Sequence, residues 1–571
     1  MGCYTPENSH FNWYSFRGGQ VRANRISHWN VWWKYYHHLA DYVSRCCFLL
    51  REGEFVGDVL IYSPQATVCT EKVLFGNRPR IIPYGDLGKT LVANGYDFDP
   101  VNDDVLQNRA QVEKGRIKVR DLTYRFLIMP RTTAVPLATM EFIRQFVLGG
   151  GIVMALDQLP SASVGLRNAP VNDARVQQIV TELFGSAGQG KNHPGGGRTY
   201  YFADYKIPSY EMRLKTFSIG PQPYQPTPPL TAAQRALLEA LREHLAPDFK
   251  LAGNQQSDGL TFLHRRLGSD DIYFVTNLQP EASHTAATFR VSGKIPEQWD
   301  PMTGRIDPVY VYQAHAEGVE IPIRLEPYAS TLFIFRSKEP SLHLSEANLE
   351  VGELNDREVK GVAGQNGEVR VTVIENGQSK TSKAMVSGLP EPLAVTGTWQ
   401  MVLEGYRFEK LEIQVSQLRS WTEDPQTEHF SGTGRYGLDF EVAARYLDKD
   451  LEAMLDLGVV GNVAEVSLNG KPVGVAWMQP YRLDVTEALQ SGANHLEILV
   501  TNTLINYVAG LKELPGVPEE LIPHYGPTVD IYDRGALEWE RREKDFHPLP
   551  PSGLMGPVRI VPRQRIVVRL E

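Results

Sequence analysis

The chain contains 571 residues, with 42% hydrophobic and 22% charged side chains, which is the composition of a globular protein of several domains. Its formal net charge is −9 and its pI is near 5.9, so duplex nucleic acid and anionic membrane surfaces are not expected as partners. No run approaches about 18 apolar residues, and the sequence therefore predicts no membrane-spanning segment.

The first 70 residues contain all four cysteines, which are Cys3, Cys46, Cys47 and Cys69. No two of them form a CxxC pair, so zinc and thioredoxin-like chemistry are not predicted, and no metal site is assigned. The opening residues, MGCYTPENSHF, lack a basic stretch followed by an apolar one, so they are not expected to be a signal peptide. The residues alone leave the localisation unknown.

Residues 28–51 are predicted to form an amphipathic helix, because apolar residues recur at three- and four-residue steps and Gly53 ends the pattern. From residue 54 to about 215, short apolar strands alternate with helices. The strands are predicted at 56–62, 124–129, 152–156 and 198–203, and the helices at 87–94, 136–148 and 173–184. This alternation predicts a parallel sheet of the flavodoxin-like form, covered by helices on both faces.

The remainder of the chain is predicted to be mainly β-structure. Residues 216–340 begin with a proline-rich linker and a helix at 231–245 and continue as a small β-sandwich. Residues 341–394 are polar and weakly patterned, so they are expected to connect two modules. Residues 395–571 contain many short strands, and Asn469-Gly470 marks a two-residue hairpin turn among them.

A series of segments in a fixed order carries a resemblance to a known family. The series is HWNVWWKYYHHLADYVSRCC, ANGYDFDPVNDDVL, FVLGGGIVMAL, EQWDPMTG and LRSWTEDPQTEHF, followed by AEVSLNGKPVG, PYRLDVT, GANHLEILVTNT and SGLMGPV. Together these segments resemble the C-terminal two-thirds of glycoside hydrolase family 106, the α-L-rhamnosidases. The last four resemble the galactose-binding-like jelly roll of sugar-cleaving enzymes.

This resemblance implies a multidomain α/β plus β fold. The implied domains are 1–53, the terminal piece of a (β/α)8 catalytic barrel; 54–215, an amidotransferase-like α/β domain; 216–340, a linker helix and small β-sandwich; 341–394, a connecting segment; and 395–571, the jelly roll. The implied activity is the release of terminal rhamnose from polysaccharides by an inverting mechanism. Secretion or a periplasmic location, and calcium as a cofactor, also follow from the resemblance alone.

Residues 1–53 would supply only the end of such a barrel, so we expect most of the catalytic barrel to be lacking and the chain alone to be inactive. The catalytic pair is unknown. For substrate binding, the resemblance places Trp29, Trp32 and Trp33, with Arg25 before them, at the edge of the barrel, where an indole could stack on a sugar. Core packing is the alternative for these rings.

Three other motifs are expected to be structural. The acidic loop Asp97–Asp104 lacks the glycine of a calcium-binding loop and is expected to cap the following helix. Glu297 and Asp300 fit a turn of the small sandwich. Gly185–Lys191 is similar to a phosphate-binding loop, but it follows a helix where a strand is required, so a helix end and a loop are predicted.

Two alternatives to a rhamnosidase-type hydrolase stay open. One is a non-catalytic carbohydrate-binding or accessory protein, and the other is a β-galactosidase-like glycosidase, since such families use a similar arrangement of barrel, α/β and β domains. In each case the expected partner is a carbohydrate, and no nucleic acid or membrane is expected. The oligomeric state and the glycan linkage are unknown.

Overall fold

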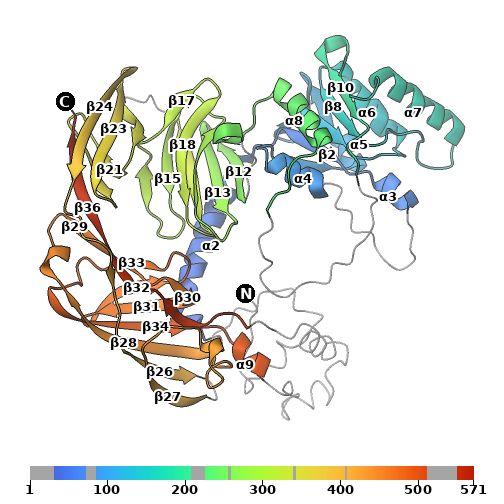
Figure 1. The fold of residues 1–571 in the computed structure, drawn as a ribbon. Coiled ribbons are helices and arrows are strands. Elements are labelled where there is room, and N and C mark those ends of the chain that lie inside the picture. The colour runs from blue at the N-terminus through green and yellow to red at the C-terminus, as the bar shows by residue number, and fades with distance from the viewer. Residues whose placement is uncertain are drawn as a thin grey trace, which may run out of the picture. The chain divides into compact units, whose positions relative to one another are not determined.

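The computed structural model describes residues 31–71, 85–188, 190–207, 226–254, 259–337, 342–405, 408–510 and 549–570. The chain divides into two compact units, each described here by itself. Of the described residues, the first unit contains those up to Ser44 and those from Leu342 onward, and the second contains those from Arg45 to Ser337. Figure 1 shows α/β structure followed by β-structure, which confirms the predicted multidomain α/β plus β class.

The second unit contains a doubly wound parallel sheet. Its strands, in spatial order, are β3 (Phe98–Val101), β2 (Val59–Tyr62), β7 (Phe126–Met129), β8 (Ile152–Leu156) and β10 (Arg198–Phe202), with the short antiparallel β9 (Lys191–Asn192) at the edge. Every residue of β2, β7 and β8 is buried. Such continuous apolar runs are typical of parallel strands that are covered on both faces.

Helices cover the two faces of this sheet (Figure 1). One face packs against α5 (Asp103–Asn108), α6 (Leu137–Leu148) and α7 (Ala169–Leu183), and the other against α4 (Gly85–Val92) and α8 (Ala232–His244). The sequence analysis grouped α8 with the following sandwich, but Leu237, Leu238 and Leu241 are fully buried in the core of the parallel sheet. The helix α3 (Gln65–Glu71) follows β2, and β4 (Ala110–Glu113), β5 (Arg116–Val119) and β6 (Leu122–Tyr124) form a small antiparallel sheet.

The second unit also contains two antiparallel sheets that enclose an aromatic core around Phe289 and Tyr273. The first sheet contains β1 (Glu54–Phe55), β12 (Leu260–Leu267), β13 (Asp270–Asn277), β19 (Ser330–Arg336), β15 (Ile295–Trp299) and β16 (Ile306–Pro308). The other contains β11 (Phe249–Leu251), β14 (Ser283–Phe289), β18 (Gly318–Leu325) and β17 (Gln313–His315). The two sheets lie on either side of this core.

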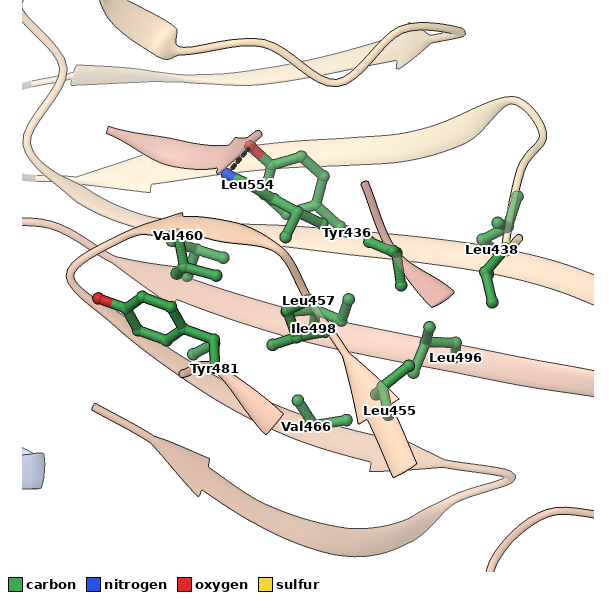
Figure 2. Packing of buried hydrophobic residues seen from close by; sticks show 14 of the residues in the cluster. Tyr436, Leu438, Leu455, Leu457, Val460, Val466, Tyr481, Leu496, Ile498 and Leu554 are labelled. Carbon is green, nitrogen blue, oxygen red and sulfur yellow. Dashed lines mark hydrogen bonds between the residues drawn. The ribbon is translucent and has the colours of Figure 1, made fainter. Parts of the chain in front are cut away.

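The first unit is built around two large antiparallel sheets and one apolar core. One sheet contains β27 (Phe408–Val415), β26 (Trp399–Gly405), β28 (Gly432–Val442), β34 (Gly492–Thr501), β31 (Val463–Leu468) and β32 (Lys471–Ala476). The other contains β21 (Glu350–Leu354), β22 (Glu358–Ala363), β36 (Arg559–Arg569), β29 (Leu451–Asp456) and β33 (Arg482–Asp484), with β25 (Leu393–Ala394) paired to β36. Figure 2 shows Leu455, Val466 and Ile498 pointing toward one another in this core.

Smaller elements complete the first unit. They are the sheet of β20 (Leu342–Ala347), β23 (Gly367–Glu375) and β24 (Gln378–Val386), the pair β30 (Val459–Gly461) and β35 (Gly553–Gly556), and the helix α9 (Ile505–Gly510). The helix α2 (Tyr36–Arg51) crosses the division between the units at Ser44. Among the described residues, no helix combines the length and apolar character needed to cross a membrane.

The segment 341–394 differs from the expected connection, because it contains six strands, β20–β25. In β23, for example, Val369, Val371 and Val373 are buried, and the residues between them are exposed or half-buried. The hairpin turn at Asn469-Gly470 is confirmed: it joins β31 to β32, with φ of 54° and 75° at its two residues.

Candidate functional site

The start of the tryptophan-rich helix packs against the sheet of the first unit that contains β31. Trp32 lies just before the short 3-10 turn Trp33–Tyr35, and Tyr35 is the last residue of that turn. Both side chains are buried together with Val463. Val475 and Trp477 border this cluster, and Tyr42 on α2 meets the Trp477 ring edge-on with 6.0 Å between ring centroids. Trp32 therefore holds the helix to the sheet.

A polar contact reinforces this packing. Glu465 of β31 accepts hydrogen bonds through one carboxylate oxygen from Lys34 Nζ at 2.8 Å and from Tyr35 Oη at 2.9 Å. The hydrogen bond from Lys34 lowers the pKa of Glu465, so this carboxylate is charged at neutral pH. A charged carboxylate with two donors fixes the position of the helix along the strand.

Of the four predicted substrate-binding residues, Arg25 and Trp29 lie outside the described residues, and the other two have different surroundings. Trp32 is 7% exposed, whereas Trp33 is 39% exposed. The Trp33 ring stacks on Tyr36 with 5.1 Å between centroids and 8° between planes. Trp33 therefore presents indole surface to solvent in a fixed orientation, and its contact with a sugar stays a prediction.

A small hollow lies in the first unit, beside the loop that carries Trp421. Trp421 Nε1 donates to Tyr436 Oη at 2.7 Å, and that hydroxyl also accepts from the Leu554 amide at 3.1 Å (Figure 2). The volume of the hollow is about 30 Å3. This is room for one or two waters, and a sugar ring would require the loop to move.

The carboxyl edge of the parallel sheet is where ligands bind in many doubly wound folds, at the point where strand order reverses. Here that point lies between β2 and β7, and Thr67 closes it. The Thr67 hydroxyl accepts from the amides of Thr133 and Ala134 at 3.0 and 3.2 Å and donates to the Ala134 carbonyl. The segments that follow the two strands are therefore bonded together at this point.

The stretch Asp97–Asp104, expected to be a loop, instead contains β3 and the start of α5, and its carboxylates accept hydrogen bonds from other parts of the second unit. Asp99 accepts from Tyr124 Oη at 2.5 Å, Asp103 accepts from Tyr62 and Thr139 at 2.8 and 2.7 Å, and the side chain of Asn102 caps α5. Burial raises the pKa of Asp97 to about 6. Within the described ranges no cluster of three or more His, Cys, Asp or Glu side chains suits a metal ion. Calcium binding stays a prediction.

The remaining sequence motifs have structural contacts. Glu297 lies in β15 rather than in a turn and accepts from Trp299 Nε1 at 3.1 Å. Asp300 accepts from the Met302 amide and the Thr303 hydroxyl in the turn that follows β15, as expected. Lys191 Nζ donates to the carbonyl of Glu182 at 2.6 Å, at the end of α7. The lysine of the phosphate-loop-like motif thus satisfies a helix C-terminus.

The sequence analysis missed a buried charge network in the second unit. His264 lies between Asp248 and Asp271, and the side chains of all three are at most 5% exposed. One sequence signal could have revealed it. In the strand LTFLHRRL, Leu260, Phe262 and His264 alternate toward the core, and a histidine at a core position requires polar partners.

Comparisons with known proteins point to one class. The family model described as alpha-L-rhamnosidase, for glycoside hydrolase family 106, matches residues 21–214 and 230–314. A rhamnosidase structure from Novosphingobium sp. PP1Y is similar over 95% of this chain and 42% of its own, with 23% identity and a TM-score of 0.59. A putative beta-glucuronidase from Formosa agariphila is 23% identical over 93% of this chain and 57% of its own length.

The chain therefore shares the fold of a glycoside hydrolase. Within that class it resembles family 106, the alpha-L-rhamnosidases, as the order of sequence segments predicted. A β-galactosidase from Bacillus circulans sp. alkalophilus also matches, over 52% of this chain and 44% of its own, with 12% identity and a TM-score of 0.31, which is too low to support the β-galactosidase alternative. The chain spans about half the length of the relatives it matches.

Proposed function

We propose that this chain belongs to a glycoside hydrolase that releases terminal α-L-rhamnose from polysaccharides. The observation that carries the proposal is the match of the alpha-L-rhamnosidase model across 21–214 and 230–314, which includes the parallel sheet and most of the small sandwich. The order of sequence segments supports the same substrate, and the fold shared with the Novosphingobium rhamnosidase is consistent with it.

In this proposal the described residues support the catalytic residues rather than supply them. Glycosidic cleavage requires two carboxyl groups about 5 to 9.5 Å apart with a sugar between them. The acidic side chains that the sequence singled out, Asp99, Asp103, Glu297 and Asp300, are bonded to neighbouring protein groups. We therefore expect catalysis to need a protein longer than this chain, consistent with its coverage of 42% of the rhamnosidase structure.

The test is hydrolysis of 4-nitrophenyl glycosides by the chain alone and by the chain joined to any coding sequence found upstream of it in the same reading frame, with and without calcium. We expect the joined protein to hydrolyse the α-L-rhamnoside and the chain alone to release nitrophenol at the background rate. Turnover of the β-D-glucuronide in its place would favour the activity in the Formosa relative's name. Turnover by the chain alone would mean that it contains a complete catalytic pair.

A second candidate function is a carbohydrate-binding accessory protein without catalysis, and the exposed Trp33 ring favours it. Aromatic faces bind the apolar faces of sugars, and a ring already fixed against Tyr36 loses little conformational freedom when a sugar binds. Binding of a rhamnose-containing polysaccharide without turnover by any form of the protein would favour this function over hydrolysis.

A further inference from the structure

The buried charge network lies where the chain passes from the α/β part of the second unit into its sandwich. The helix α8 ends at His244 and β11 begins at Phe249, so Leu245–Asp248 make the connection. The α/β part bonds to this segment through Tyr96 Oη, which donates to the Leu245 carbonyl at 2.7 Å, and through the Gly95 carbonyl, which accepts from the Asp248 amide at 2.8 Å.

The sandwich bonds to the same segment. Arg290 donates to the Ala246 carbonyl at 3.0 Å, and its guanidinium also reaches Asp58, the residue before β2. At Gly95 the two parts approach so closely that an added Cβ would lie 1.9 Å from the Phe249 carbonyl oxygen. The connection is therefore held from both sides, and Asp248 is its only carboxylate.

His264 bonds to two carboxylates at once. Its Nδ1 lies 2.7 Å from Asp248 Oδ2, and its Nε2 lies 2.9 Å from Asp271 Oδ1. An ionised carboxylate only accepts hydrogen bonds, so both ring nitrogens must carry protons for both bonds to form. The ring also stacks on Tyr273 with 3.9 Å between centroids, which prevents it from tilting away from either carboxylate.

Neither carboxylate requires a proton of its own, because other donors serve the remaining oxygens. Tyr273 Oη donates to Asp248 Oδ1 at 2.8 Å. Asp271 accepts from Arg266 Nε at 2.9 Å and from Lys294 Nζ. The doubly protonated, positively charged ring is therefore the state of His264 that satisfies every hydrogen bond in the cluster.

We propose that His264 is a proton-dependent latch on the connection between the α/β part and the sandwich of the second unit. While the ring carries both protons, it ties Asp248 of the connection to Asp271 of the β12–β13 hairpin. When the ring loses one proton, a nitrogen lone pair faces a carboxylate oxygen at less than 3 Å, and one of the two bonds is replaced by repulsion. The latch is then loosened.

The charges around the ring set the direction of the pH dependence. Asp248, Asp271 and Tyr273 contact the ring, and Asp97 interacts with it electrostatically. Arg266 and Lys294 contact Asp271, and Arg290 pairs with Asp248 and Asp58. Burial disfavours the charged ring, but the carboxylates of Asp248 and Asp271 outweigh burial and raise the pKa of His264. The pKa values of Asp248 and Asp271 are lowered, because the ring and the basic side chains outweigh the burial of these carboxylates.

Because the folded-state pKa of His264 is raised, the latch contributes its full stabilisation below the ordinary histidine pKa of 6.5. That contribution is lost as the pH rises from there through the raised pKa. Because one proton is linked to the latch, the equilibrium constant for local opening of the connection increases by up to about tenfold per pH unit in this window. Above the raised pKa this equilibrium constant no longer changes with pH.

Hydrogen–deuterium exchange of the whole chain, read by mass spectrometry between pH 5.5 and 9.5 and corrected for intrinsic base catalysis, tests the latch. We expect the protection of peptides from 245–251 and 260–275 to fall by up to about tenfold per pH unit as the pH rises. Peptides from β31 and β34 of the first unit should keep their protection. A flat profile in the 245–251 and 260–275 peptides would overturn the proposal.

The His264→Gln variant provides the matched comparison, because glutamine has one donor group and does not titrate. We expect it to be loosened at pH 6 as much as the wild type is at alkaline pH, with no pH slope. His315→Gln removes an exposed histidine from β17 and should keep the wild-type slope. If the slope persists in His264→Gln, the latch is wrong. If that variant does not fold, the pH profiles of the wild type and His315→Gln test the latch, and a flat profile in both would overturn it.

Discussion

At the scale of single residues, the adjacent side chains of Trp32 and Trp33 have opposite roles. Trp32 is buried with Tyr35 and Val463, while Trp33 lies on the surface against Tyr36. The nearby Lys34–Glu465 ion pair joins side chains that are 54% and 42% exposed, so it is worth no more than about 1 kcal/mol. Apolar burial of Trp32 therefore contributes more than this ion pair to holding the helix on the sheet.

We expect Trp32→Ala to destabilise the first unit by about 3 kcal/mol, because a large buried ring would leave a cavity. Trp33→Ala serves as the matched control, with an expected change below about 1 kcal/mol. Calorimetric unfolding of the two variants checks the stability. Affinity electrophoresis through a rhamnose-containing polysaccharide checks the sugar contact, where only Trp33→Ala should migrate faster than the wild type. Equal destabilisation by the two changes would contradict the assignment.

At the scale of elements, the sequence predicted best where one periodicity dominated. The strands β2, β7 and β8 are continuous apolar runs between helices, and their parallel arrangement followed from that pattern. The strands β20–β24 were missed because Ser, Thr, Lys and Glu crowd their exposed sides and hide the alternating valines. The helix α8 was predicted at 231–245, but its packing partner depended on contacts that local sequence does not encode.

The Asn469-Gly470 turn allows a direct test of one element. An added Cβ at Gly470 would meet no atom within 4 Å, so any penalty for a side chain there comes from its φ of +75°. We expect Gly470→Val to destabilise the first unit by roughly 1–3 kcal/mol, because β-branched residues disfavour positive φ. Gly364 is also in open space but has no positive φ, so Gly364→Val is the control. Urea unfolding followed by circular dichroism compares the two, and similar midpoints would count against backbone strain.

At the scale of the whole molecule, the features that the sequence missed join distant parts of the chain. Asp58 and Arg290 are 232 residues apart, and Asp248 is 16 residues from His264, so no spacing rule links them. The same limit applies to Glu465, which lies 431 residues from Lys34. The resemblance to family 106 identified the class, but it could not identify which polar side chains meet in the core.

The extent of the first unit makes a final prediction about autonomous folding. The sequence analysis placed the start of the jelly roll at residue 395, but β22 pairs with β36 over six residues, from Glu358↔Arg569 to Ala363↔Gln564. A fragment of 395–571 would therefore lack three strands of that sheet, β21, β22 and β25, and would leave one side of β36 without its partner strands. Val359, which is fully buried, would be lost with them.

We expect the fragment 342–571 to unfold cooperatively and at a higher temperature than 395–571, because it retains β21 and β22 and does not expose the edge of β36. A fragment of 364–571, which keeps β23 and β24 but lacks β20–β22, is the control and should behave like the shorter fragment. Thermal unfolding by circular dichroism, together with light scattering for aggregation through the exposed edge, distinguishes these outcomes. If 395–571 is as stable as 342–571, the paired strands before residue 395 are dispensable and the unit is smaller than its sheet topology indicates.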